Sequence, residues 1–285
     1  MTPVVLWDGH PRTPITPGEE NNMHRRSFTT AAVGLGLALA LAACGPADDN
    51  AGGAAPTTAP ASPKDTLIAA APASSGKSFS FTSTGAGAKG SGRVDPASKG
   101  NDLSFAYTDA ELGFTMDMKF LVVDADAWVK ITFENTDGLT GLPKYPKKWM
   151  HLDKSKVTDT DGEYIFDPDP LSTSSVLKAI VSAEKAGEGD YSGTLDLTAA
   201  PDATIVDEEV LKDLGDAAKA VPFTATIGAD GHLATLTVKV PKAGKNKAYT
   251  YTEKYADYGT AKPVSAPAAG DAQEAPDSAY EMLNS

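Results

Sequence analysis

The residues whose types and spacing most clearly indicate chemistry are Leu41, Ala42, Ala43 and Cys44. Cys44 is the single cysteine of the 285-residue chain, and it ends a short apolar run of small residues. This spacing is typical of a lipobox, at which the preceding segment is cleaved and the cysteine thiol becomes a thioether-linked diacylglycerol. The alternative is a buried cysteine in a core helix, but the glycine and proline directly after Cys44 disfavour it.

The segment before Cys44 has the composition of a signal peptide. Arg25 and Arg26 supply positive charge, and the stretch from Ala31 to Ala40 is apolar. The apolar run continues to Ala43 and is 13 residues long, whereas a membrane-spanning helix needs about 20. We therefore expect residues 1–43 to be a signal-peptide region that is removed, with translation starting at Met23.

Two export routes fit this region. Arg25-Arg26-Ser27-Phe28 resembles a twin-arginine signal, but threonines stand where leucine and lysine usually follow, so ordinary Sec secretion fits equally well. Either route would place the chain at the outer face of the plasma membrane, anchored by lipid on Cys44.

The charge of the chain limits its partners. The formal net charge is -13, and residues 1–43 carry three acids and three arginines, so their removal leaves it unchanged. Such an acidic chain does not bind nucleic acid by neutralising phosphates, and anionic lipid repels it. We expect the lipid anchor, and not charge, to hold it at the membrane.

Other residues that could perform catalysis are few. After Cys44 the histidines are His151 and His232, and no nucleophile elbow, zinc-protease motif or phosphate-binding loop accompanies them. The acidic run 159–163 resembles a calcium loop, but Val157 and Pro168 would occupy its first and last ligand positions. We expect no enzyme, no metal and no cofactor.

Composition divides the remaining chain into three parts. Residues 44–65 are rich in Ala, Gly, Pro and Thr, and we expect a flexible tether behind the lipidated cysteine. Residues 66–262 carry the apolar residues of a folded domain. Residues 263–285 are rich in Pro and Ala and acidic, and we expect a disordered tail.

Apolar and polar residues alternate through most of the predicted domain. This period of two predicts strands with one buried and one wet face, which is typical of antiparallel sheets. The apolar positions are Phe79 and Phe81; Leu103, Phe105 and Tyr107; Phe114, Met116, Met118, Phe120 and Val122; Val129, Ile131 and Phe133; Tyr191, Leu195 and Leu197; Phe223, Ala225 and Ile227; Ala234, Leu236, Val238 and Val240; and Tyr249, Tyr251 and Tyr255.

Two segments, Ser172–Ala186 and Asp207–Ala220, change to a helical period. Acidic or hydroxyl residues precede each apolar stripe, and Gly187 follows the first. The sequence therefore predicts an α+β fold with two helices against the apolar face of a long antiparallel sheet.

Two such helices would be too short to cover the whole apolar face, so the sequence leaves two interpretations open. The face is either an ordinary core or the lining of a cavity for a hydrophobic ligand. The candidate lining residues are Phe105, Phe114, Met116, Met118, Phe120, Ile131, Phe133, Val176, Ile180 and Leu214. Lys147, Lys148 and Trp149 are candidates for its rim.

The order of these features resembles the actinobacterial LppX/LprA/LprF/LprG lipoprotein family. The residues that carry the resemblance are Trp128-Val129-Lys130-Ile131, Lys148-Trp149-Met150-His151-Leu152-Asp153, Tyr191-Ser192-Gly193-Thr194 and Tyr255-Ala256-Asp257-Tyr258-Gly259. The resemblance implies a half-barrel like that of the LolA and LolB lipoprotein carriers, in which a curved sheet wraps around short helices. It also implies binding or transport of a lipid or glycolipid in the cell envelope. The alternative function is a solid-cored module that binds an envelope protein.

Overall fold

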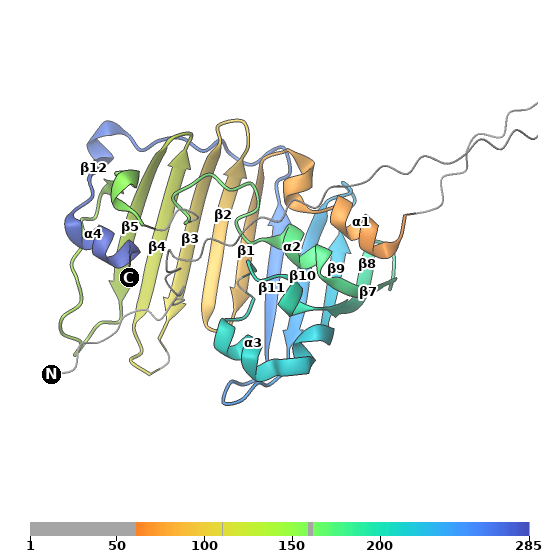
Figure 1. Ribbon diagram of the computed structural model, residues 1–285. Helices are drawn as coiled ribbons and strands as arrows, with labels where there is room; N and C mark the ends of the chain where they lie inside the picture. The colour runs from red at the N-terminus through yellow and green to blue at the C-terminus, as the bar shows by residue number, and fades with distance from the viewer. Residues whose placement is uncertain (1–60, 110, 159–161, 204, 285) are drawn as a thin grey trace, which may run out of the picture. The chain divides into compact units, whose positions relative to one another are not determined.

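The computed structural model describes residues 61–284 except residues 110, 159–161 and 204 (Figure 1). Contacts along the chain separate residues 1–60 from a compact unit, Ala61–Ser285, which contains both hydrophobic clusters of the structure. The predicted signal-peptide region, lipobox and Cys44 lie outside the described residues. Within the described ranges, no helix combines the length and the hydropathy that crossing a membrane requires.

In the described residues, twelve strands form one open sheet in the order β12-β6-β5-β4-β3-β2-β1-β11-β10-β9-β8-β7. Neighbouring strands are antiparallel except β12 and β6, which are parallel. The strands are β1 (Phe79–Gly85), β2 (Ala88–Asp95), β3 (Gly100–Thr108), β4 (Thr115–Val123), β5 (Asp126–Glu134), β6 (Trp149–His151), β7 (Ile180–Lys185), β8 (Asp190–Leu195), β9 (Val221–Ile227), β10 (Leu233–Val240), β11 (Tyr249–Ala256) and β12 (Ala272–Glu274). The predicted α+β class with an antiparallel sheet is confirmed.

One face of the sheet, which we call the inner face, carries the large apolar side chains. The register aligns Phe81, Leu103, Phe120, Val129 and Met150 across neighbouring strands, and each is at most 3% exposed. Burying aligned apolar side chains on one face of each pair is the main stabilising interaction of such a sheet.

Strand β2 was not predicted, because its inner positions include Gly90 and Gly92 in place of apolar side chains. A Cβ atom on Gly92 would lie 2.9 Å from carbon atoms of both Phe81 and Leu103. The glycine therefore leaves room for the Phe81 ring and the Leu103 side chain on the neighbouring strands, a role that a period-two pattern does not reveal.

The described residues contain four α-helices, all short: α1 (Pro63–Ala69), α2 (Thr173–Lys178), α3 (Glu208–Leu214) and α4 (Asp277–Leu283). In Figure 1, α1, α2 and α3 lie over the half of the sheet that contains β7 to β11, and α4 lies over β5. Leu67, Val176, Leu214 and Tyr280 bring one side chain from each helix into the main hydrophobic cluster. The short 3-10 helices are Pro72–Ser75, Lys154–Lys156, Leu197–Ala199, Gly215–Ala220 and Ala269–Asp271.

The predicted helix Ser172–Ala186 is correct only in its first half. α2 ends at Lys178, and the chain continues as β7, an edge strand in which Ile180 pairs with Leu195. Val181, expected in the apolar stripe, is 62% exposed. The consecutive β-branched residues Ile180 and Val181 favour strand over helix, and Val181 lies at an irregularity between the pairs that Ile180 and Ser182 form with β8. The second predicted helix is present as α3 and the 3-10 helix that follows it.

The predicted tether is too long at its C-terminal end, because α1 begins at Pro63. The Ser62 hydroxyl oxygen accepts a hydrogen bond from the Asp65 backbone N–H at 3.1 Å, and proline occupies the first helical position. Both are start signals of a helix. Leu67, fully buried, then fixes α1 against the core.

The prediction of a disordered tail is wrong. After β11 the chain forms a buried contact at Val264, whose backbone N–H donates to the Asp95 carboxylate at 3.2 Å. It then adds β12 to the far edge of the sheet and ends in α4. The segment is rich in Pro and Ala, which is why its composition predicts disorder. A few specific contacts order it, and composition does not reveal such contacts.

Tyr280 is the principal anchor of α4. It is 6% exposed, its hydroxyl oxygen accepts a hydrogen bond from the Asp153 backbone N–H at 2.8 Å, and the Lys156 ammonium lies 5.1 Å from its ring centre. Asn284 adds hydrogen bonds to Thr158 and to the Lys156 carbonyl. The tail is thus attached to the loop that follows β6.

We predict that Tyr280→Ala lowers the free energy of unfolding by about 3 kcal/mol, because it removes a buried ring. Tyr280→Phe keeps the ring and loses the hydrogen bond, so it should cost about 1 kcal/mol. Urea unfolding of residues 61–285 measures both. The exposed neighbour Glu281→Ala is the control, and equal stability of Tyr280→Ala and this control would contradict an ordered tail.

Candidate functional site

Two further rows of aligned side chains cross the inner face beyond the fully buried one. The first contains Phe105, Met118 and Ile131, and the second contains Tyr107, Met116 and Phe133. The register thus brings five of the predicted lining residues together on β3, β4 and β5. The prediction that these residues share one face of the sheet is confirmed.

Exposure is uneven in these rows: Ile131 and Met116 are buried, at 2% and 6% exposed. Leu103 and Phe120, in the buried row, are each 1% exposed, whereas Phe105, Met118 and Phe133 are partly exposed and Tyr107 is 48% exposed. We call Phe105, Tyr107, Met118 and Phe133 the apolar strip. It lies between the part of the sheet under α1 to α3 and the part under α4 (Figure 1).

Aromatic rings border the strip on one side. The Tyr145 ring stacks on Phe133 with 6.3 Å between ring centres, and its hydroxyl donates to the Ser278 carbonyl at 3.3 Å. Phe114, which is 4% exposed, also contacts Phe133, with ring centres 6.2 Å apart. The strip is therefore attached to α4 through Tyr145.

Other candidate lining residues do not adjoin the strip. Val176 on α2, Ile180 on β7 and Leu214 on α3 are buried in the main hydrophobic cluster over the other half of the sheet. β7 is the opposite sheet edge from β12, so Ile180 is several strands away from Met118. These three residues are core side chains.

Trp149 was predicted at the rim, but it lies on the outer face of the sheet. Met150 pairs with Val129 on the inner face, so alternation turns Trp149 outward. There the Lys130 ammonium lies 4.6 Å from its ring centre, and a small cluster of Leu121, Trp128 and Val264 adjoins it. Lys147 and Lys148 are exposed in the loop before β6.

A buried carboxyl group is the main polar feature of the inner face. Glu253 on β11 is 0% exposed. The Tyr251 hydroxyl donates to its Oε1 at 3.0 Å, while the Tyr255 hydroxyl and Thr173 Oγ1 lie 2.8 and 2.9 Å from its Oε2. Thr173 is the first residue of α2, so the carboxyl group links that helix to the sheet.

The geometry favours the neutral acid. Glu253 Oε2, Thr173 Oγ1 and Tyr255 Oη are mutually within hydrogen-bond distance, with 2.5 Å between the two hydroxyl oxygens. Three hydrogen bonds among these atoms need three protons, but the two hydroxyl groups have only one proton each. A proton on Glu253 would supply the third hydrogen bond. Burial, with a smaller contribution from the charge of Asp169, raises the pKa of Glu253 to about 7 against the three hydrogen bonds that lower it.

The two histidines make ordinary polar contacts. His151 lies 3.2 Å from Asp126 and 3.5 Å from Glu274 on the sheet edge. His232 lies 3.2 Å from the Lys77 ammonium, and its ring is 4.6 Å from that of Tyr258. Among the described residues, no three His, Cys, Asp or Glu side chains are grouped as a metal site requires.

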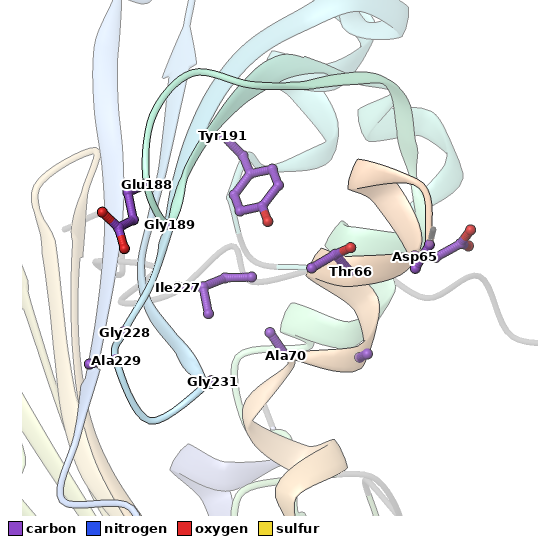
Figure 2. Close-up of a pocket in the computed structure, with 12 residues that line it drawn as sticks. Asp65, Thr66, Ala70, Glu188, Gly189, Tyr191, Ile227, Gly228, Ala229 and Gly231 are labelled. Atoms are coloured by element: carbon purple, nitrogen blue, oxygen red, sulfur yellow. The ribbon is translucent and has the colours of Figure 1, made fainter. Parts of the chain in front are cut away.

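A pocket of about 670 Å³ opens between α1 and the ends of β8 and β9. Figure 2 shows Thr66 of α1 and Ala70, which directly follows α1, facing Tyr191 and Ile227 across it. None of the predicted lining residues contributes to it. The residues that line the pocket are distant from one another in sequence, so the sequence does not predict it. Alternation predicts only that Tyr191 and Ile227 face the inner side of the sheet.

No protein-family model matches the sequence, and no curated protein matches it. The interpretation of the site therefore depends on the residues and their geometry.

We predict that Glu253→Gln changes how stability depends on pH. The pKa of Glu253 is raised from 4.5 to about 7 in the folded state, so its stabilising proton is fully present below pH 4.5 and is lost as pH rises through 7. The free energy of unfolding of the variant, relative to that of the unsubstituted chain, should rise by roughly 3 kcal/mol between pH 4.5 and 8.

Urea unfolding at a series of pH values measures this difference. Glu134→Gln, an exposed substitution on β5, is the control for a change of net charge. A stability difference between the Glu253→Gln variant and the unsubstituted chain that is constant with pH would contradict the buried neutral acid.

Proposed function

We propose that this chain is a lipid-anchored protein at the outer face of the plasma membrane that binds a hydrophobic lipid or glycolipid against the apolar strip. The observation that carries the proposal is the partial exposure of Phe105, Met118 and Phe133, with Tyr107 at 48%, on strands whose neighbouring inner-face row is buried. Each 100 Å² of apolar surface moved out of water contributes about 2.5 kcal/mol. A ligand chain laid on the strip would therefore bind by burial alone.

The side chains of the strip suit a flexible apolar ligand. Met118 has an unbranched, polarisable side chain that adapts to different shapes, and Phe105 and Phe133 offer flat rings on either side. Contiguous exposed apolar surface on a soluble domain commonly marks a binding site. Burial of a lipid needs no cofactor and no covalent step.

The sequence before the folded unit supports the location. A lipobox at Leu41 to Cys44 would place a diacylglycerol anchor 17 residues before Ala61. The net charge of -13 repels anionic headgroups, so specificity for the ligand would come from apolar contact and from polar groups at the edge of the strip, with Lys147 and Lys148 as candidates. The half-barrel architecture and the LppX/LprG-like family belong to the same proposal.

A second candidate function is a solid-cored module that binds an envelope protein. The observation that favours it is the outer-face cluster around Trp128 and Trp149, where Lys130 covers an aromatic ring. Tryptophan is enriched in protein interfaces relative to the rest of the surface.

We predict that Met118→Glu weakens binding of a fluorescent fatty-acid probe to residues 61–285 at least tenfold, because a carboxylate would have to be desolvated beneath the acyl chain. Lys119→Glu introduces the same side chain on the next residue, which points to the outer face, and it should leave the affinity within twofold. Probe titration followed by fluorescence gives both dissociation constants. Equal affinities of two folded variants would place the ligand elsewhere.

A further inference from the structure

The pocket beneath α1 is separate from the apolar strip and has the features of a ligand site. Its volume of about 670 Å³ lies within the roughly 300–1,000 Å³ typical of small-molecule pockets. Ala69 and Ala70, at the end of α1 and directly after it, and Ile227 of β9 supply apolar lining, and Thr66 and Tyr191 supply hydroxyl groups.

Tyr191 is the residue that indicates a ligand. Its side chain is on the inner face of β8 and the residue is only 8% exposed. Figure 2 shows its hydroxyl directed into the pocket, toward the space between Thr66 and Ile227. Among the described residues no group hydrogen-bonds the hydroxyl, which faces the open pocket, so its partner there is water or a ligand.

The remaining polar groups of the pocket define the charge of the ligand. Asp65 and Glu188 line it, and no lysine or arginine does. Both carboxylates are directed away from the interior in Figure 2, and Asp65 Oδ2 accepts a hydrogen bond from Ser62 at 2.6 Å. Their negative charge repels a carboxylate or phosphate on a ligand. The pocket lining has no lysine or arginine that could bind such a group.

We propose that the pocket beneath α1 binds an uncharged apolar molecule with a carbonyl oxygen, such as an ester or amide, which accepts a hydrogen bond from the Tyr191 hydroxyl. The apolar part of the ligand lies on Ile227, Ala69 and Ala70. Thr66 Oγ1 donates to the Ser62 carbonyl at 2.9 Å, so its free lone pairs can only accept from the ligand. The Tyr191 hydroxyl is then the donor that selects a carbonyl.

Methyl octanoate is the probe for this site, with octanoate and octane as comparisons. Binding to residues 61–285 is followed by NMR through the Ile227 methyl signals, which report this pocket and not the strip. We expect methyl octanoate to bind more tightly than octanoate. Tyr191→Phe removes only the hydroxyl, so it should weaken the ester about tenfold and leave octane unchanged.

Two further variants separate the possible causes. Thr66→Trp fills the pocket, and a folded Thr66→Trp variant should no longer bind methyl octanoate. Tyr107→Phe removes a hydroxyl from the strip and should change nothing at Ile227. The proposal is overturned if Tyr191→Phe binds the ester as tightly as the unsubstituted chain, if octanoate binds equally well, or if folded Thr66→Trp still binds. Failure of lipid to bind at the strip would leave these results unaffected.

Discussion

The inner face of the sheet must be kept from water, and the rest of the structure depends on this constraint. The twelve strands of the described region place most of their large apolar side chains on that face, while the four described α-helices are six or seven residues long. Three helices cover the half around β7 to β11, and the C-terminal segment crosses to the opposite edge and brings α4 there. The apolar strip lies between these two covers, and the segment that follows β6 crosses the same strands nearer the buried row, where the Asn101 side-chain amide donates to the Asp167 carbonyl.

The inner face also changes character along a single row of aligned residues. From β5 to β11 the row contains Ile131, Met118, Phe105, Gly90, Ser83 and Glu253. Glycine and serine in the middle separate the apolar strip from the buried acid, and a Cβ atom on Gly90 would lie 2.4 Å from the Ser83 hydroxyl oxygen. The neutral state of Glu253 is compatible with this apolar surrounding, whereas an ionised carboxylate would be costly there. Below pH 7 the carboxyl group thus fixes α2 to the sheet without placing a charge in the core.

The sequence predicts the parts of the fold that follow from alternation. The pattern from Phe114 to Val122 identifies β4 and the shared face of Met116 and Met118, because side chains in a strand alternate strictly. It does not predict α4, whose order depends on tertiary anchors such as Tyr280, which meets a loop about 130 positions earlier. It names Trp149 as a rim residue, whereas the pairing of the short strand β6 with β5 places it on the outer face. Glu253 could have been noticed as an acid at an inward position between Tyr251 and Tyr255, but Tyr191 and Thr66 meet only through tertiary packing.

Native mass spectrometry of residues 61–285, purified from a bacterial envelope extract and then extracted with organic solvent, tests most directly whether this protein carries a hydrophobic lipid. The account predicts a bound apolar lipid at close to one molecule per chain, released by the solvent. A mass equal to that of the bare chain, unchanged after incubation with envelope lipids, would contradict it and would favour a protein-binding module.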